Sequence, residues 1–157
     1  MTGALCNPQE WAERPLLHDR AAVLERIAQR HEMAMLHGIL HHDPEQRLAI
    51  GIHDSNATDF WVRGHIPGRP LMPGVVMIEI SAQLCAWLGS FSTEIGGSFM
   101  GFAGIDDARF RGQVVPGDRL IVASKVLRLR RNIASFATQS WVGRELVFEA
   151  KIFGAKV

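Results

Sequence analysis

The chain has 157 residues, of which 47% are hydrophobic and 21% are charged, as in ordinary globular proteins with a buried core. Its net charge of +1 gives no overall field that would favour nucleic acid, and its longest apolar stretch is too short and too interrupted for a membrane span. Cys6 and Cys85 lie far apart and indicate neither a disulfide framework nor a metal motif. From the length we expect a single domain over residues 1–157. Because residues 1–9 lack the pattern of a signal peptide, we expect this domain in the cytoplasm.

The first 31 residues are expected to form an arm followed by a short helix. Residues 1–18 mix prolines, a tryptophan and charges without periodicity. From Asp19 onward, apolar residues recur at helical spacing, and the Asp19 side chain is suited to cap the helix. The pattern predicts that this helix ends near His31.

Two strands are predicted before the centre of the chain. Residues 33–41 form a mostly apolar run, and residues 47–54 alternate between apolar and polar side chains. The turn signal at residues 43–45 lies between them. Residues 54–57 are then expected to form a loop that leads into a single helical turn over residues 59–62.

The central stretch begins as a rigid loop and continues as an apolar helix. Residues 65–74 contain three prolines and two glycines, and residues 75–89 carry Glu79 as their single charge. Pro73 is suited to the first turn of the helix, where its missing N–H costs nothing. Because almost no polar face is present, we expect this helix to be buried on nearly every side.

The remainder of the chain reads as strands joined by turns. A connection is expected over residues 92–98, where two glycines are adjacent. The predicted strands cover residues 99–110, 119–131, 133–142 and 146–157, with turns at residues 114–118 and 142–145. Two strands before and four after one long helix predict an α+β fold, in which an antiparallel sheet of about six strands wraps around that helix.

The central stretch also holds the residue types that acid–base chemistry requires. A histidine side chain can take up and release a proton near neutral pH, and the prolines around His65 restrict its loop. Glu79, among apolar neighbours, must either be paired or be readily protonated, as suits a general acid, and Gln83 lies one turn away. The Gly74 amide lies at the positive end of the helix, where it can bind an oxyanion. This set favours proton abstraction next to a carbonyl followed by elimination, or the reverse hydration.

Structural interpretations of the same residues remain open at this point. A histidine in a loop is often merely exposed, and a glutamate in an apolar helix can face a cavity or a partner subunit. His41 and His42 next to Asp43 could indicate a metal site, but adjacent strand residues point to opposite faces, so we expect no metal there.

Two blocks of the sequence carry a family resemblance. The first is Gly64-His65-Ile66-Pro67-Gly68-Arg69-Pro70-Leu71-Met72-Pro73-Gly74-Val75, followed by Glu79 and Ala82-Gln83, and the second covers residues 103–118. Together they resemble the FabZ-type (3R)-hydroxyacyl-[acyl-carrier-protein] dehydratases, whose motif has a glutamate fourteen residues after the histidine. Three features depart from that family: Ile66 replaces a phenylalanine, the segment at residues 28–33 barely matches, and the chain has no tyrosine.

The resemblance implies a hotdog fold, a dimer joined edge to edge and further assembly into a hexamer. It also implies active sites that combine the histidine of one subunit with the glutamate of the other. His65 would then remove the C2 proton of a 3-hydroxyacyl thioester, and Glu79, supported by Gln83, would protonate the departing hydroxyl. The Gly74 amide would stabilise the thioester oxygen. The product is a trans-2-enoyl thioester, and no cofactor or metal is required.

The resemblance further implies an acyl tunnel and a carrier protein as partner. Apolar side chains that could line the tunnel are those of Met72, Met77, Phe99, Met100 and Phe102. Because acyl carrier proteins are acidic, basic residues on two predicted strands could form a patch for docking. The candidates are Arg109, Arg111 and Arg128, although a solvated strand face would have the same composition.

Two other functions remain as alternatives. Hotdog domains also hydrolyse thioesters, so an acyl thioesterase is the first, but the histidine loop favours the lyase. A non-catalytic acyl-binding module is the second, and the presence of both His65 and Glu79 argues against it. Neither the length of the acyl chain nor the pathway is specified by these motifs.

Overall fold

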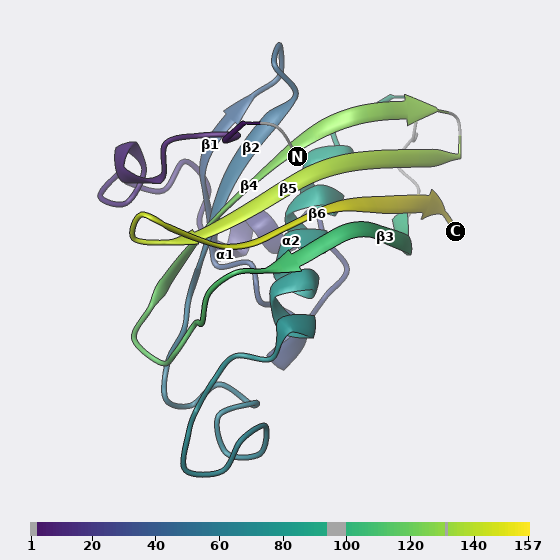
Figure 1. Ribbon diagram of the computed structural model, residues 1–157. Helices are drawn as coiled ribbons and strands as arrows, with labels where there is room; N and C mark the ends of the chain where they lie inside the picture. The colour runs from purple at the N-terminus through teal and green to yellow at the C-terminus, as the bar shows by residue number, and fades with distance from the viewer. Residues whose placement is uncertain (1–2, 94–99, 131) are drawn as a thin grey trace.

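The computed structural model describes residues 3–93, 100–130 and 132–157. Within these ranges, six antiparallel strands form one sheet in the order β1-β2-β4-β5-β6-β3, which curves around helix α2 (Figure 1). The strands are β1 (Gly38–Asp43), β2 (Leu48–Asp54), β3 (Met100–Phe110), β4 (Arg119–Arg130), β5 (Ile133–Val142) and β6 (Glu145–Lys156). The helices are α1 (Arg20–Leu24) and α2 (Gly74–Gly89), with short 3₁₀ turns η1 (Pro8–Glu10) and η2 (His31–Met33). The expected sheet around a central helix is therefore confirmed.

Helix α2 has the environment that its sequence predicts. Ten of its sixteen residues are buried, and the helix packs against the sheet mainly through β4 and β5. The placement of Pro73 in the first turn is wrong by one residue. Its ψ of 138° is not helical, so it caps the helix from outside, and its carbonyl accepts the amide of Val76 at 2.9 Å. Among the described helices, none is long and apolar enough to cross a membrane.

Helix α1 is shorter than predicted. The Asp19 side chain caps it as expected, at 3.0 Å from the amide of Ala22, but the helix ends at Leu24 and not near His31. The guanidinium of Arg30 binds the carbonyls of Leu24 and Ile27 at 3.0 and 2.7 Å. These carbonyls would accept amides of the next turn in a continuing helix, so the Arg30 side chain replaces that turn.

Two further boundaries differ from the prediction. The strand expected from residue 33 begins only at Gly38, because the amides of Met35 and Leu36 bind the side chain of Gln83. Residues 59–62 form a hydrogen-bonded turn in place of the expected helical turn. Most of the predicted connection after α2, together with Phe99, lies outside the described residues.

The N-terminal arm covers the outer face of the sheet. Its apolar residues, among them Leu5, Cys6 and Trp11, pack on side chains of β1, β2, β4 and β5. The side chain of Gln139 on β5 holds the arm in place, because its oxygen accepts the amide of Leu5 at 2.7 Å. Burial raises the pKa of the Cys6 thiol to about 12, so this thiol stays protonated.

Candidate active site

His65 is held by its own loop with one ring nitrogen available. Its amide binds the carbonyl of Trp61, a residue that is 3% exposed and anchors the loop in the core. The His65 ring is exposed, and its Nδ1 lies 2.8 Å from the carbonyl oxygen of Leu71. Since a carbonyl can only accept, Nδ1 carries the hydrogen, and Nε2 of the neutral ring keeps its lone pair. The loop therefore prepares His65 to accept a proton at Nε2.

The end of the second sequence block, residues 114–118, is hydrogen-bonded to both ends of the connection between β2 and α2, which contains His65. At the first end, Ser55 accepts the amide of Gly117 and donates its own amide to the carbonyl of Asp118, at 2.8 and 2.9 Å. At the second end, the amide of Met72 binds the carbonyl of Val114 at 2.9 Å. The two blocks of the family resemblance thus form one supporting structure in space.

Gly74 begins α2 beside the ring of Phe110. A Cβ atom at this position would lie 2.8 Å from Cε1 of Phe110, so only glycine fits without moving the ring. The amide of the first helical residue has no acceptor inside its own helix and lies at the positive end of the dipole. Gly74, Phe110 and His65 line one mostly apolar cavity of about 410 Å³. A carbonyl oxygen bound there would find a hydrogen-bond donor in the same cavity as the His65 ring.

Glu79 is half-buried and paired with two side-chain amides. Its Oε1 accepts hydrogen bonds from Nε2 of Gln83 at 2.7 Å and from Nε2 of Gln29 at 3.3 Å. The pairing that the sequence left as one possibility is therefore present in the structure. The expected bond between Glu79 and Gln83 is present, whereas Gln29 was missed because it lies 50 residues away in sequence.

His65 and Glu79 line separate cavities of one chain. Glu79 lines a second cavity of about 50 Å³, together with Met100 and Phe102. Within the described residues, this cavity shares no lining residue with the cavity of His65. Of the tunnel candidates, Met72 and Met77 line the larger cavity, and Met100 and Phe102 line the smaller one. Within one chain, His65 and Glu79 therefore line different cavities.

Comparison with known proteins gives the family. Residues 27–151, which contain both cavities' main residues, match the FabA-like domain. The chain belongs to the FabA-like family. Its similarity to FabZ-type dehydratases is confirmed by two relatives named 3-hydroxyacyl-[acyl-carrier-protein] dehydratase FabZ. The one from Pelotomaculum thermopropionicum is 38% identical over 133 residues, covering 85% of this chain and 94% of the relative. The one from Desulforamulus reducens is 38% identical over 137 residues, covering 87% and 96%.

Solved structures confirm the hotdog fold. The dehydratase heterocomplex ApeI:P from Xenorhabdus doucetiae superposes with a TM-score of 0.72 at 13% identity, covering 86% of this chain and 90% of that chain. The PaaI protein of E. coli superposes with a TM-score of 0.62 at 12% identity, covering 87% and 89%. At these identities the likeness concerns the fold alone.

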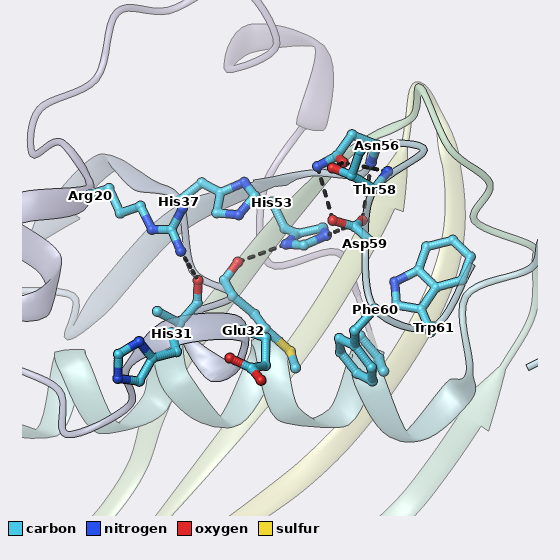
Figure 2. Close-up of a pocket in the computed structure, with 13 residues that line it drawn as sticks. Arg20, His31, Glu32, His37, His53, Asn56, Thr58, Asp59, Phe60 and Trp61 are labelled. Carbon is cyan, nitrogen blue, oxygen red and sulfur yellow. Dashed lines mark hydrogen bonds and ion pairs between the residues drawn. The ribbon is translucent and has the colours of Figure 1, made fainter. Parts of the chain in front are cut away.

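This FabA-like domain also contains a polar pocket of about 200 Å³ that the sequence analysis did not predict (Figure 2). The rings of His37 and His53 stack there with centroids 4.5 Å apart. His53 is 3% exposed; its Nδ1 donates to the carbonyl of Met35 at 2.7 Å, and its Nε2 lies 3.7 Å from Oδ2 of Asp59. The same Asp59 oxygen accepts a hydrogen bond from the amide of Asn56 at 3.0 Å, at the start of the loop that leads to His65. These contacts connect the pocket to the start of that loop. A prediction of the register between β1 and β2 could have placed His37 and His53 side by side.

We expect the free energy of unfolding of this fold to depend on pH in the acid range because of His37. Burial, followed by the nearby His53, lowers the pKa of His37 from 6.5 to about 4, and its Nδ1 accepts the amide of Asp54. Between these two values the unfolded chain binds more protons, so the free energy of unfolding falls as pH drops from about 6.5 to about 4. The variant His37→Asn keeps an acceptor without a titrating ring. Denaturant unfolding across this window should show a flatter dependence for the variant, and equal slopes would refute the assignment.

The side chains of His41 and His42 have different neighbours. The His41 ring packs on Trp11 of the arm, with centroids 4.6 Å apart, and the His42 ring contacts Trp87 of α2 at 5.1 Å. The two rings therefore lie on opposite faces of the sheet, as the alternation along a strand predicts.

The three candidate arginines differ in their surroundings and in their place in the sheet. Arg111 makes an ion pair with Glu149, a residue that is 5% exposed, and this pairing lowers the pKa of the Glu149 carboxyl. Arg109 and Arg128 are exposed, but their strands β3 and β4 are separated in the sheet by β6 and β5. Arg109 and Arg128 are therefore set apart across the sheet, because β3 and β4 follow one another in sequence but are not neighbours in space.

Proposed function

We infer that this chain is a hydro-lyase that converts (3R)-3-hydroxyacyl thioesters of acyl carrier protein to trans-2-enoyl thioesters in fatty-acid biosynthesis. The observation that carries this inference is the His65 ring, whose Nδ1 is bound to Leu71 and whose Nε2 is left as a base beside the Gly74 amide. Relatives named FabZ, aligned with 85–87% of the chain, support the substrate class.

Each group has one task in the proposed reaction. Nε2 of His65 removes the proton from C2, and the Gly74 amide donates to the thioester oxygen as negative charge develops there. The electron pair of the C2–H bond forms the C2–C3 double bond, and the C3–O bond breaks. Glu79 gives its proton to the leaving hydroxyl, so that water departs. The protonated His65 and the ionised Glu79 exchange protons with solvent before the next turnover.

We propose that two copies of the chain complete each active site. His65 and Glu79 line separate cavities of one chain, which supports a site in which a second chain supplies the missing partner. Strand β3 is an edge strand within the described sheet, and its Phe102, which is 54% exposed, lies beside the cavity of Glu79. Pairing of β3 with β3 of a second copy would continue the sheet and cover this apolar surface.

The acyl chain would follow the apolar side chains around both cavities. We propose Met72 and Met77 near His65, and Met100 and Phe102 near Glu79, as its lining, together with Phe99. We also place the reaction in the cytoplasm, where the reducing conditions suit two cysteines that are both free.

The test of the activity is direct. Purified protein is given a 3-hydroxyacyl thioester of acyl carrier protein, and the absorbance of the enoyl product is followed. We expect His65→Ala and Glu79→Gln each to lower the rate by about 10²- to 10⁴-fold, the range for loss of a general base or acid. Release of free thiol without an enoyl product would identify a thioesterase, and no product of either kind would identify a binding module.

Docking of the acidic carrier is expected to depend on exposed arginines. We expect Arg109→Glu or Arg128→Glu to raise KM for the carrier-bound substrate by about tenfold through weaker electrostatic steering. Activity on a free pantetheine thioester, which has no carrier to dock, serves as the control. An equal rise in KM for both substrates would contradict the docking role. Arg111 is a poor test site, because its removal would leave the buried Glu149 without the cation of its ion pair.

A further inference from the structure

The carboxyl group of Glu79 is held through one oxygen only. Both amide donors, from Gln29 and Gln83, bind Oε1, and no donor among the described residues binds Oε2. An oxygen that accepts two N–H groups has little room for a proton of its own. The proton of the neutral carboxyl group therefore belongs on Oε2, the oxygen that remains free for the substrate.

The two amides differ in how they are fixed. All four hydrogen-bonding positions of Gln83 are used: its oxygen accepts the amides of Met35 and Leu36, and its Nε2 donates to the carbonyl of Met33 and to Glu79. Gln29 donates to Glu79, but its own Oε1 is buried and has no hydrogen-bond partner among the described residues. A buried oxygen without a partner costs stability. The donor contact of Gln29 is therefore kept at a cost to the fold.

The backbone around Gln29 is shaped to make this contact. The Arg30 guanidinium that ends α1 binds the carbonyl of Gln29 itself at 2.7 Å, in addition to those of Leu24 and Ile27. The resulting turn brings the side chain of Gln29 to the cavity of Glu79, where both residues are part of the lining. A helix continued to residue 31 would have left these carbonyls to backbone amides.

We propose that Gln29 is a positioning residue for the acid of the reaction. This proposal rests on the function proposed above. Together with Gln83, it fixes Oε1 of Glu79, directs the proton on Oε2 toward the leaving hydroxyl, and stabilises the carboxylate that forms once that proton has left. Gln29 itself contacts no reacting atom.

The test compares turnover with stability in Gln29→Met, which keeps the length of the side chain and removes both polar atoms. We expect kcat to fall by about tenfold with KM unchanged, the effect of losing one hydrogen bond in the transition state. We expect the thermal midpoint to stay equal or rise, because the unpartnered oxygen is removed as well. Gln46→Met, an exposed glutamine in the β1–β2 turn, is the matched control and should behave as wild type. A fall of kcat that parallels a fall of the thermal midpoint would overturn the proposal.

A second experiment, in the Glu79→Asp variant, tests whether Gln29 acts through Glu79. Glu79→Asp keeps a carboxyl group but withdraws it by one methylene from both amides. Adding Gln29→Met in this background should cost less than about twofold in kcat, since the contact is already broken. A further tenfold loss would overturn the positioning role. If wild type is active, Glu79→Gln is inactive and Gln29→Met equals wild type, only this proposal fails; if wild type forms no enoyl product, the proposed function fails.

Discussion

Mixing two inactive variants should restore activity. When His65→Ala and Glu79→Gln chains are co-refolded in equal amounts, about half of the dimers are hybrids if pairing is random. A site built from two chains leaves one intact His65–Glu79 pair in each hybrid, and the other site carries both substitutions. We therefore expect about a quarter of the wild-type rate from a mixture whose separate components are nearly inactive.

The outcome distinguishes shared sites from sites within one chain. If His65 and Glu79 of the same chain worked together, each site of a hybrid would lack one group, and mixing would restore nothing. The control is co-refolding of each variant with itself, followed by the same assay of enoyl absorbance. Light scattering on the mixture gives the assembly size and separates a dimer from a hexamer. Absence of recovery in a mixture shown to contain hybrids would contradict the shared site.

Replacing Gln83 should damage both stability and activity. Gln83 is 0% exposed, and Gln83→Leu would leave the amides of Met35 and Leu36 and the carbonyl of Met33 without their side-chain partner. Because unsatisfied buried groups are costly, we expect the free energy of unfolding to fall by about 3–5 kcal/mol. The same change removes the shorter of the two bonds to Glu79, so kcat should fall even in protein that remains folded.

A matched variant separates these effects. Gln139 is also buried, at 3% exposed, but it binds the N-terminal arm on the outer face of the sheet. Gln139→Leu should lower the free energy of unfolding less and leave kcat unchanged. Denaturant titration and steady-state kinetics of both variants are sufficient. Equal stability losses, or a normal kcat for Gln83→Leu, would contradict the role assigned to Gln83.

Local patterns were sufficient for the elements and for the candidate residues with chemical roles. The apolar run after Pro73 predicted α2, alternation predicted β2, and the runs between turn signals predicted β4, β5 and β6 to within two residues. They failed between residues 24 and 37, where side chains replace backbone partners: Arg30 ends α1 early, and Gln83 delays β1. Such contacts join groups that meet only in the folded chain. The periodicity of apolar residues along the sequence therefore does not predict them.

The sequence by itself determined which groups are available for chemistry, because the spacing of His65, Gly74 and Glu79 along a loop and a helix is a local property. Only the tertiary structure decided how they are used. Sheet order leaves β3 at an edge and separates Arg109 from Arg128, and packing brings Gln29 to Glu79 across 50 residues. It also places His65 and Glu79 in different cavities. These arrangements follow from burial of the whole chain around α2, a long-range balance that the spacing of residues does not contain.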